Sequence, residues 1–115
     1  MAVTKQDFSV FQRSNYDLEY TISKEDGTPQ DCTGASFELT WTDSRNGFLA
    51  LSISDNNRFV ISGSNSNVVT ITITEDELDI NDATYRHELR LRDVFGNTAP
   101  VAAGTVTVNV STTNV

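Results

Sequence analysis

The sequence is poor in the residues that build covalent and metal-bound scaffolds, with one Cys, one His, one Met and one Trp among its 115 residues. A single Cys excludes an internal disulfide, and with it the class of small secreted domains that disulfides hold together. One Cys and one His cannot supply the four Cys or His ligands of a usual structural zinc site. Pro occurs only twice and apolar residues are spread evenly, so we expect an ordered chain.

Positive charge is also scarce, with 8 Lys and Arg against 16 Asp and Glu and a net charge of −8. Nucleic acids and anionic membrane surfaces are bound through Lys and Arg, so this balance argues against both as partners. No apolar run exceeds four residues, whereas a membrane-spanning helix needs about 20. The N-terminus lacks the apolar segment of a secretory signal, so we expect synthesis and use, or assembly, in a reducing cytoplasm.

What is abundant is alternation of apolar and polar residues with a period of two. The clearest stretches are 16–23, 37–42, 49–53, 69–74, 85–92 and 105–110. Successive side chains of a strand point to opposite faces, so each stretch has one apolar and one polar face, as in antiparallel sheets with one face in water. Turn signals such as Asp26-Gly27 and Asn46-Gly47 recur between the stretches. The pattern predicts an all-β fold, an immunoglobulin-like antiparallel β-sandwich of about seven strands.

One segment departs from the alternation. Thr74 and Glu77 have the spacing of a capping box, and acidic residues fill the turn between them. We predict a short helical turn near 75–80. The length fits one core, so we expect a single β-sandwich domain over 1–110 and a frayed tail over 111–115.

The order of motifs along the chain resembles that of small phage tail and baseplate proteins, and is similar to the N-terminal domain of siphophage upper baseplate proteins. The motifs are KQDFSVFQ at 5–12, YDLEYTI at 16–22, EDGTPQDCTGA at 25–35, VTITITEDEL at 69–78, ATYRHELRL at 83–91, FGN at 95–97 and GTVTV at 104–108.

This resemblance implies a non-enzymatic structural or adaptor component of a bacteriophage particle, in its tail, baseplate or neck. It also implies assembly in the host cytoplasm into the virion, contact with other phage structural proteins, several copies that form a homo-oligomer, and no cofactor.

The best candidate for a functional surface is a row of charged residues in the stretch 85–92. The polar positions of this alternation are occupied by Arg86, Glu88, Arg90 and Arg92. They form a locally basic row in an acidic chain. One interpretation is pairing with acids across the sheet, such as Glu19 or Glu38, at little gain in stability. The other is a docking face in an assembly, because Arg is enriched at protein interfaces.

Enzymatic candidates are weak. His87 shares the apolar phase, which favours a hydrogen-bonded core histidine over a general base. Cys32 is flanked by acids rather than cations, which favours an inert buried thiol. Asp17 and Glu19 share a polar face and are expected to solvate a sheet rather than to form a hydrolytic pair. We therefore predict no catalytic and no cofactor-binding residues.

An acidic stretch invites a calcium interpretation. It comprises Glu75, Asp76, Glu77, Asp79 and Asp82. An EF-hand that begins at Asp79 would need Gly where Thr84 stands and Glu where Arg90 stands, so that frame fails. A loose loop site that includes Asn81 stays open, although helix capping and solvation are the simpler interpretation.

The alternative function is a carbohydrate-binding or host-adhesion and decoration module, which would present exposed aromatic rings. The residues Trp41, Tyr16, Tyr20 and Tyr85 fall on apolar phases instead. Three further aromatics, Phe48, Phe59 and Phe95, lie in or beside turns, and we expect them to cover the ends of the sandwich. The other interpretation is that one of them is an exposed contact, and exposed aromatics in the turns 44–48 or 94–97 would favour the carbohydrate-binding alternative.

Overall fold

The computed structural model describes residues 3–110, which form nine strands and one short 3₁₀ helix. The elements are β1 (Thr4–Lys5), β2 (Phe8–Phe11), β3 (Tyr16–Thr21), β4 (Ser36–Asp43), β5 (Leu49–Ile53), η1 (Asn56–Arg58), β6 (Phe59–Ser62), β7 (Val68–Ile73), β8 (Ala83–Arg92) and β9 (Thr98–Asn109). The predicted frayed tail lies outside the described residues, and the single-domain boundary at residue 110 stays a prediction.

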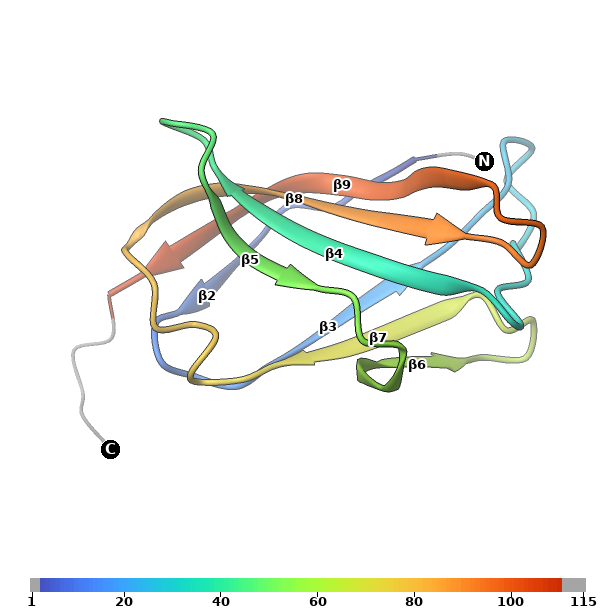
Figure 1. Ribbon diagram of the computed structural model, residues 1–115, viewed down its shortest axis with the longest axis horizontal. Helices are drawn as coiled ribbons and strands as arrows, with labels where there is room; N and C mark the ends of the chain where they lie inside the picture. Colours follow the sequence, from blue (N-terminus) through green and yellow to red (C-terminus); the bar gives the residue numbers. More distant parts are fainter. Residues whose placement is uncertain (1–2, 111–115) are drawn as a thin grey trace.

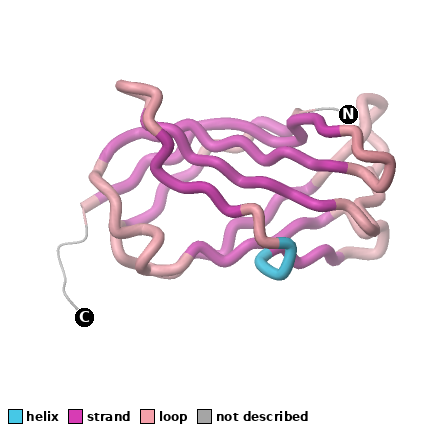
Figure 2. The backbone as a smooth tube through the Cα atoms, in the orientation of Figure 1, coloured by secondary structure: helices cyan, strands magenta, loops and turns pink. Residues whose placement is uncertain are grey.

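The strands form two sheets that face each other across a shared core (Figure 1). The larger sheet has six strands in the order β1-β9-β8-β4-β5, with β2 also paired to β9, and the smaller has the order β3-β7-β6. Strands dominate the chain, and the 3₁₀ helix is a small loop between β5 and β6 (Figure 2). The all-β fold is therefore confirmed.

The prediction of purely antiparallel pairing is wrong at one edge. Both β1 and β2 run parallel to β9, with Thr4 opposite Ala102 and Phe8 opposite Val106. The remaining pairs, such as β4 with β8 and β3 with β7, are antiparallel. Alternation reports which side chains face inward but says nothing of strand direction, so the sequence pattern could not show this edge.

The number of strands also differs from the prediction, with nine strands in the described residues rather than seven. The first strand is divided because residues Gln6 and Asp7 separate β1 from β2. The short strand β6 was missed because Phe59, Val60 and Ile61 form a continuous apolar run without alternation.

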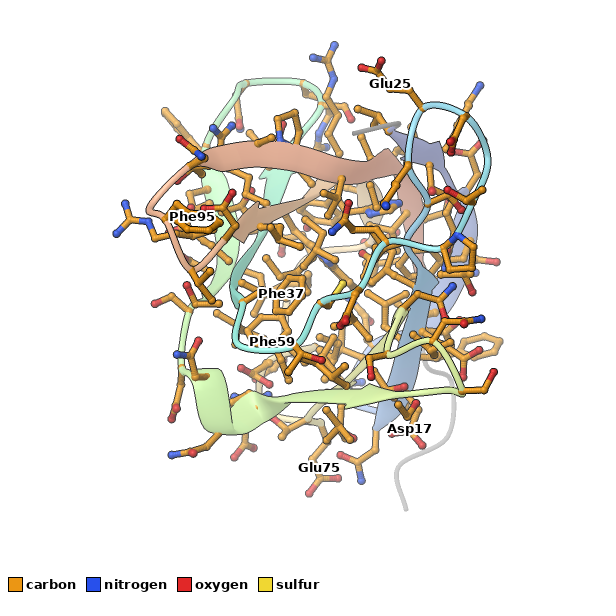
Figure 3. The ribbon with its side chains drawn as sticks, turned by 90° about the vertical axis from the view of Figure 1, so that its right-hand side faces the viewer. Asp17, Glu25, Phe37, Phe59, Glu75 and Phe95 are labelled. Atoms are coloured by element: carbon orange, nitrogen blue, oxygen red, sulfur yellow. The ribbon has the colours of Figure 1, made fainter. Side chains whose placement is uncertain are left out.

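The core is built from the apolar phases of both sheets. Trp41 and Leu39 of the larger sheet are fully buried, as are Tyr20 and Leu18 of the smaller one. Phe37 of β4 and Phe59 of β6 meet between the layers with ring centroids 5.5 Å apart (Figure 3). Burial of each such side chain contributes about 1.5–3 kcal/mol, so the two sheets hold together through this shared interior.

The predicted single helical turn near 75–80 is present as one hydrogen-bonded turn, which begins at Thr74. The Leu78 amide donates to the Thr74 carbonyl at 3.0 Å, and the Glu77 carboxylate accepts from the Thr74 amide at 3.0 Å. Glu77 N–H in turn donates to Thr74 Oγ1, which completes the capping box. The turn places Leu78 in the core, where it is fully buried. The helical element of the described residues is η1, which Asp55 caps.

Candidate functional site

The predicted row of charges lies on the outer face of the six-stranded sheet. In β8, Tyr85, His87, Leu89 and Leu91 are buried, and the residues between them point outward. Arg86 and Arg92 are exposed, whereas Glu88 and Arg90 are half-buried. The structure therefore brings the four predicted residues together on one face because they share one phase of a single strand.

The ion pairs within this row are local. Arg90 Nη1 lies 3.0 Å from Glu88 Oε1, two positions away on the same strand. Arg92 Nε donates to Thr98 Oγ1 at 3.3 Å, and neither Arg86 nor Arg92 forms an ion pair with any residue from Val3 to Val110. The row thus retains two unpaired guanidinium groups.

The cross-strand partners expected for the row are not those that the structure shows. Glu38 lies opposite Arg90 in the β4–β8 register, but the carboxylate that pairs with Arg90 belongs to Glu88. Glu19 lies on β3, which belongs to the other sheet. The prediction that Glu19 pairs with the arginine row is therefore wrong.

Sequence reasoning missed a further cation on this face. Lys5 of β1 joins Arg86, Thr40 and Thr105 around an open hollow of about 560 Å³. The parallel pairing of β1 with β9 brings Lys5 there from 81 positions away along the chain, so no local pattern could have indicated it. We call the outer surface of the six-stranded sheet around Lys5, Arg86, Arg90 and Arg92 the basic face.

His87 lies beneath the basic face and holds three parts of the fold together. Its side chain is 1% exposed, Nε2 is hydrogen-bonded to the Gln6 carbonyl, and Nδ1 lies 2.9 Å from the Tyr20 hydroxyl. A carbonyl can only accept, so we assign the proton to Nε2, and Nδ1 then accepts from Tyr20. Burial lowers the pKa of His87, although the Gln6 carbonyl and Asp7 oppose the shift. Both ring nitrogens are occupied, so the arrangement confirms a hydrogen-bonded core histidine.

Cys32 is a buried free thiol. The Sγ atom lies 3.4 Å from the Gln30 carbonyl, and burial, with a smaller effect of Asp31, raises the pKa of the thiol to about 11. The reactive form is the thiolate, which such a pKa suppresses at neutral pH. The predicted burial of Cys32 is confirmed, and the raised pKa agrees with the prediction of an inert thiol.

The acidic stretch is divided among separate structural roles. Glu77 caps its turn and pairs with Arg58, with 2.6 Å between Oε1 and Nη2. Asp79 lies 4.0 Å from Arg13, and Asp76 and Asp82 are exposed. From Val3 to Val110, no three His, Cys, Asp or Glu side chains come together in a way that could hold a metal ion.

The aromatic residues beside turns do not behave alike. Phe59 is half-buried against Phe37, as expected of a residue that covers the core. Phe48 and Phe95 are 73% and 87% exposed, so the prediction that they cover the ends of the sandwich is wrong. Each lies in the loop of a hairpin, Phe48 between β4 and β5 and Phe95 between β8 and β9, beyond the end of the preceding strand.

No helix within the described part of the chain is long and apolar enough to span a membrane. Comparison with models of known protein families finds no match, and a search of curated proteins finds no significant match.

Proposed function

We propose that this protein is a non-enzymatic structural or adaptor component of a bacteriophage particle, located in the tail, baseplate or neck. The resemblance of its ordered motifs to siphophage upper baseplate proteins suggests the setting, and we propose an immunoglobulin-like arrangement of its two sheets. It assembles in the host cytoplasm with other phage structural proteins, in several copies, and remains in the virion. Neither nucleic acid nor a membrane is among its proposed partners.

The observation that carries the proposal is the basic face. In a chain of net charge −8, two guanidinium groups of β8 point into solvent without an ion pair in residues 3–110. Arg forms strong bidentate contacts with carboxylates and is enriched at protein interfaces, so this face suits an acidic protein surface. The rigid sheet behind it fixes the spacing of the charges, which favours assembly over chemistry.

Mass spectrometry of particles purified from the bacterium that carries the gene tests this proposal. We expect the chain in the particle fraction, and we expect the double substitution Arg86→Glu and Arg92→Glu to reduce its incorporation. A Lys24→Glu variant, which alters an exposed turn residue outside the basic face, should be incorporated normally. If the expressed wild-type chain is absent from purified particles, the proposal is wrong.

A second candidate function rests on the two exposed rings. Phe48 and Phe95 are exposed at opposite ends of the six-stranded sheet, and exposed aromatic rings can stack on sugars. A host-adhesion or decoration module would bind glycans through one of them. Glycan-array binding that is lost in Phe48→Ala or Phe95→Ala, but kept in Val94→Ala, would support this function over the first.

A further inference from the structure

Arg86 and Arg92 lie on the outer surface of one sheet, and Asp17 and Glu19 lie on the outer surface of the other. On the three-stranded sheet, Asp17 and Glu19 project from β3 at alternate positions and are exposed. Asp17 and Glu75 both point away from the core on this side of the molecule (Figure 3). We call the surface around Asp17, Glu19 and Glu75 the acidic face.

The guanidinium group that contacts the three-stranded sheet beside the acidic face is already paired with a carboxylate. Arg58 contacts the Thr72 carbonyl at 2.7 Å on this sheet, but its charge is paired with Glu77 at 2.6 Å. Asp17 accepts only a neutral hydrogen bond, from Thr72 Oγ1 at 2.7 Å. No cation of residues 3–110 forms an ion pair with either Asp17 or Glu19.

The basic face is the counterpart on the opposite side of the sandwich. Carboxylates also lie on this face, but within residues 3–110 no ion pair joins them to Arg86 or Arg92: Glu88 pairs with Arg90, Asp7 accepts from the Thr105 amide at 2.9 Å, and Glu38 lies opposite Arg90. Arg86 and Arg92 are six residues apart on β8, which separates them by roughly 20 Å, and the two acids of β3 are roughly 7 Å apart. The basic face can therefore receive a pair of acids at either end.

We infer that the acidic face of one copy of this chain docks on the basic face of a second copy. The inference rests on the proposed function, because it names the partner of the same basic face. Charge complementarity identifies the occupant, since one chain carries both the unpaired cations and the unpaired acids on opposite sides. Contact between two different faces is heterologous, so copies stack head to tail into a ring or an open array.

The net charge of −8 opposes association only at long range. At an ionic strength of about 0.1 M the Debye length is about 10 Å, so repulsion between distant charges is largely screened while pairs in contact keep most of their attraction. At about 1 M the Debye length falls to about 3 Å, and the contacts between faces weaken as well. Association should therefore be stronger at about 0.1 M salt than at about 1 M.

Analytical ultracentrifugation of the full chain tests the inference with two charge-reversed variants. The first carries Arg86→Glu and Arg92→Glu, and the second carries Asp17→Lys and Glu19→Lys. We expect each variant alone to self-associate at least about tenfold more weakly than the wild type, because like charges then meet at the interface. Lys24→Glu and Asp82→Lys, at exposed positions outside both faces, serve as charge controls and should leave association unchanged.

The mixture of the two variants is the deciding measurement. The reversed face of each variant is complementary to a face of the other, so the mixture should recover at least about wild-type association. Recovery also shows that both variants are folded. Mixed variants that stay monomeric, or variants that self-associate as strongly as the wild type, would overturn the inference. Detection of the chain in particles together with either result would leave the proposed function intact with a different partner.

Discussion

The two sides of the sandwich, where the edge strands of both sheets lie, differ in how completely those edges are covered. On one side, which we call the closed side, residues 4–11 pair with β9 and also reach the edge of β3, where Thr4 Oγ1 donates to the Thr21 carbonyl and Gln6 Nε2 to the Glu19 carbonyl. On the other, the open side, β5 and β6 are the last strands of their sheets. The closed side is therefore held by hydrogen bonds between the two sheets, whereas the open side has edge strands with backbone hydrogen-bonding groups that are free within residues 3–110.

The closed side depends on a close approach between backbones. A Cβ atom at Gly104 would lie 2.0 Å from the Gln6 carbonyl oxygen, the same oxygen that binds His87. Glycine is therefore required at position 104 for space rather than for its backbone angles. One residue without a side chain lets the first strand, the last strand and the core histidine meet.

The open side lacks two of the usual protections of an edge, charge and Pro, although a register shift between Trp41 and Thr42 interrupts the pairing of β4 with β5. Neither β5, with the sequence LALSI, nor β6, with FVIS, contains Pro or a charged residue. Leu49 and Val60 are 61% and 59% exposed. Natural edge strands are commonly blunted by charge, Pro or bulges, so this side is the less protected of the two. Comparison of the two sides predicts large effects on the closed side and small ones on the open side.

The largest effect is expected for Gly104→Val. The new side chain would displace Gln6 and separate β1 from the core, and we expect the free energy of unfolding to fall by about 3 kcal/mol or more. Urea denaturation followed by tryptophan fluorescence measures it. Ala103→Val, at the adjacent half-buried position, is the matched control and should cost much less. Equal losses in both variants would show that the close approach at position 104 is unimportant.

A smaller decrease in the free energy of unfolding is expected for His87→Phe, which keeps a buried ring but removes both hydrogen bonds of the imidazole. The Gln6 carbonyl and the Tyr20 hydroxyl would be left unpaired, at an expected cost of about 2–3 kcal/mol. Tyr20→Phe removes only one of these bonds and should cost about 1 kcal/mol. A negligible change in His87→Phe, by the same denaturation measurement, would contradict the tethering role.

The same residue predicts a pH dependence. Burial holds the folded-state pKa of His87 below its ordinary value of about 6.5, so the unfolded chain binds the proton more readily. Stability should therefore be complete above about pH 6.5 and fall as pH falls from there toward the folded pKa. The loss should be absent in His87→Phe, since the carboxyl groups with lowered pKa, such as Asp26 and Asp31, act only below about pH 4. Equal pH profiles for both proteins would refute this assignment.

On the open side, Arg58→Ala should cost about 1–2 kcal/mol, because the lost hydrogen bonds involve charged and partly buried groups. The side chains of Arg58 and Glu77 are 32% and 22% exposed. Arg90→Ala breaks the pair with Glu88, whose side chains are more accessible at 40% and 43% exposed, and is expected to cost less than about 0.5 kcal/mol. Thermal denaturation of the two variants ranks them, and the reverse order would show that burial does not control the strength of these pairs.

The smallest effect on stability is expected for Leu49→Lys, within about 0.5 kcal/mol, because the side chain is already exposed. A charge at the β5 edge should instead slow aggregation during prolonged incubation at high protein concentration. Thr84→Lys, an exposed site on the interior strand β8, adds the same charge away from the edge. Light scattering compares them, and equal aggregation rates would show that the open edge is not the site of aggregation.

Much of the interior could be predicted from the sequence, because alternation fixes which side chains face inward. The alternation predicts inward-facing side chains for Trp41, Tyr85 and His87, and all three are buried. The same phase rule grouped the arginine row correctly on one face. It could not supply Lys5 or exclude Glu19, because phase does not state which sheet a strand joins or which strand lies beside it.

The sequence by itself determined that this is an all-β chain with one apolar stripe per strand, since a period of two admits no other regular structure. It also determined the local devices, such as the capping box of Thr74 and Glu77, whose partners are three residues apart. Only the tertiary structure decided that the first strand runs parallel to the last, and that Lys5 joins the arginines of β8 on one outer face while Asp17 and Glu19 lie on the other. Those features depend on contacts between distant segments, which a local pattern does not encode.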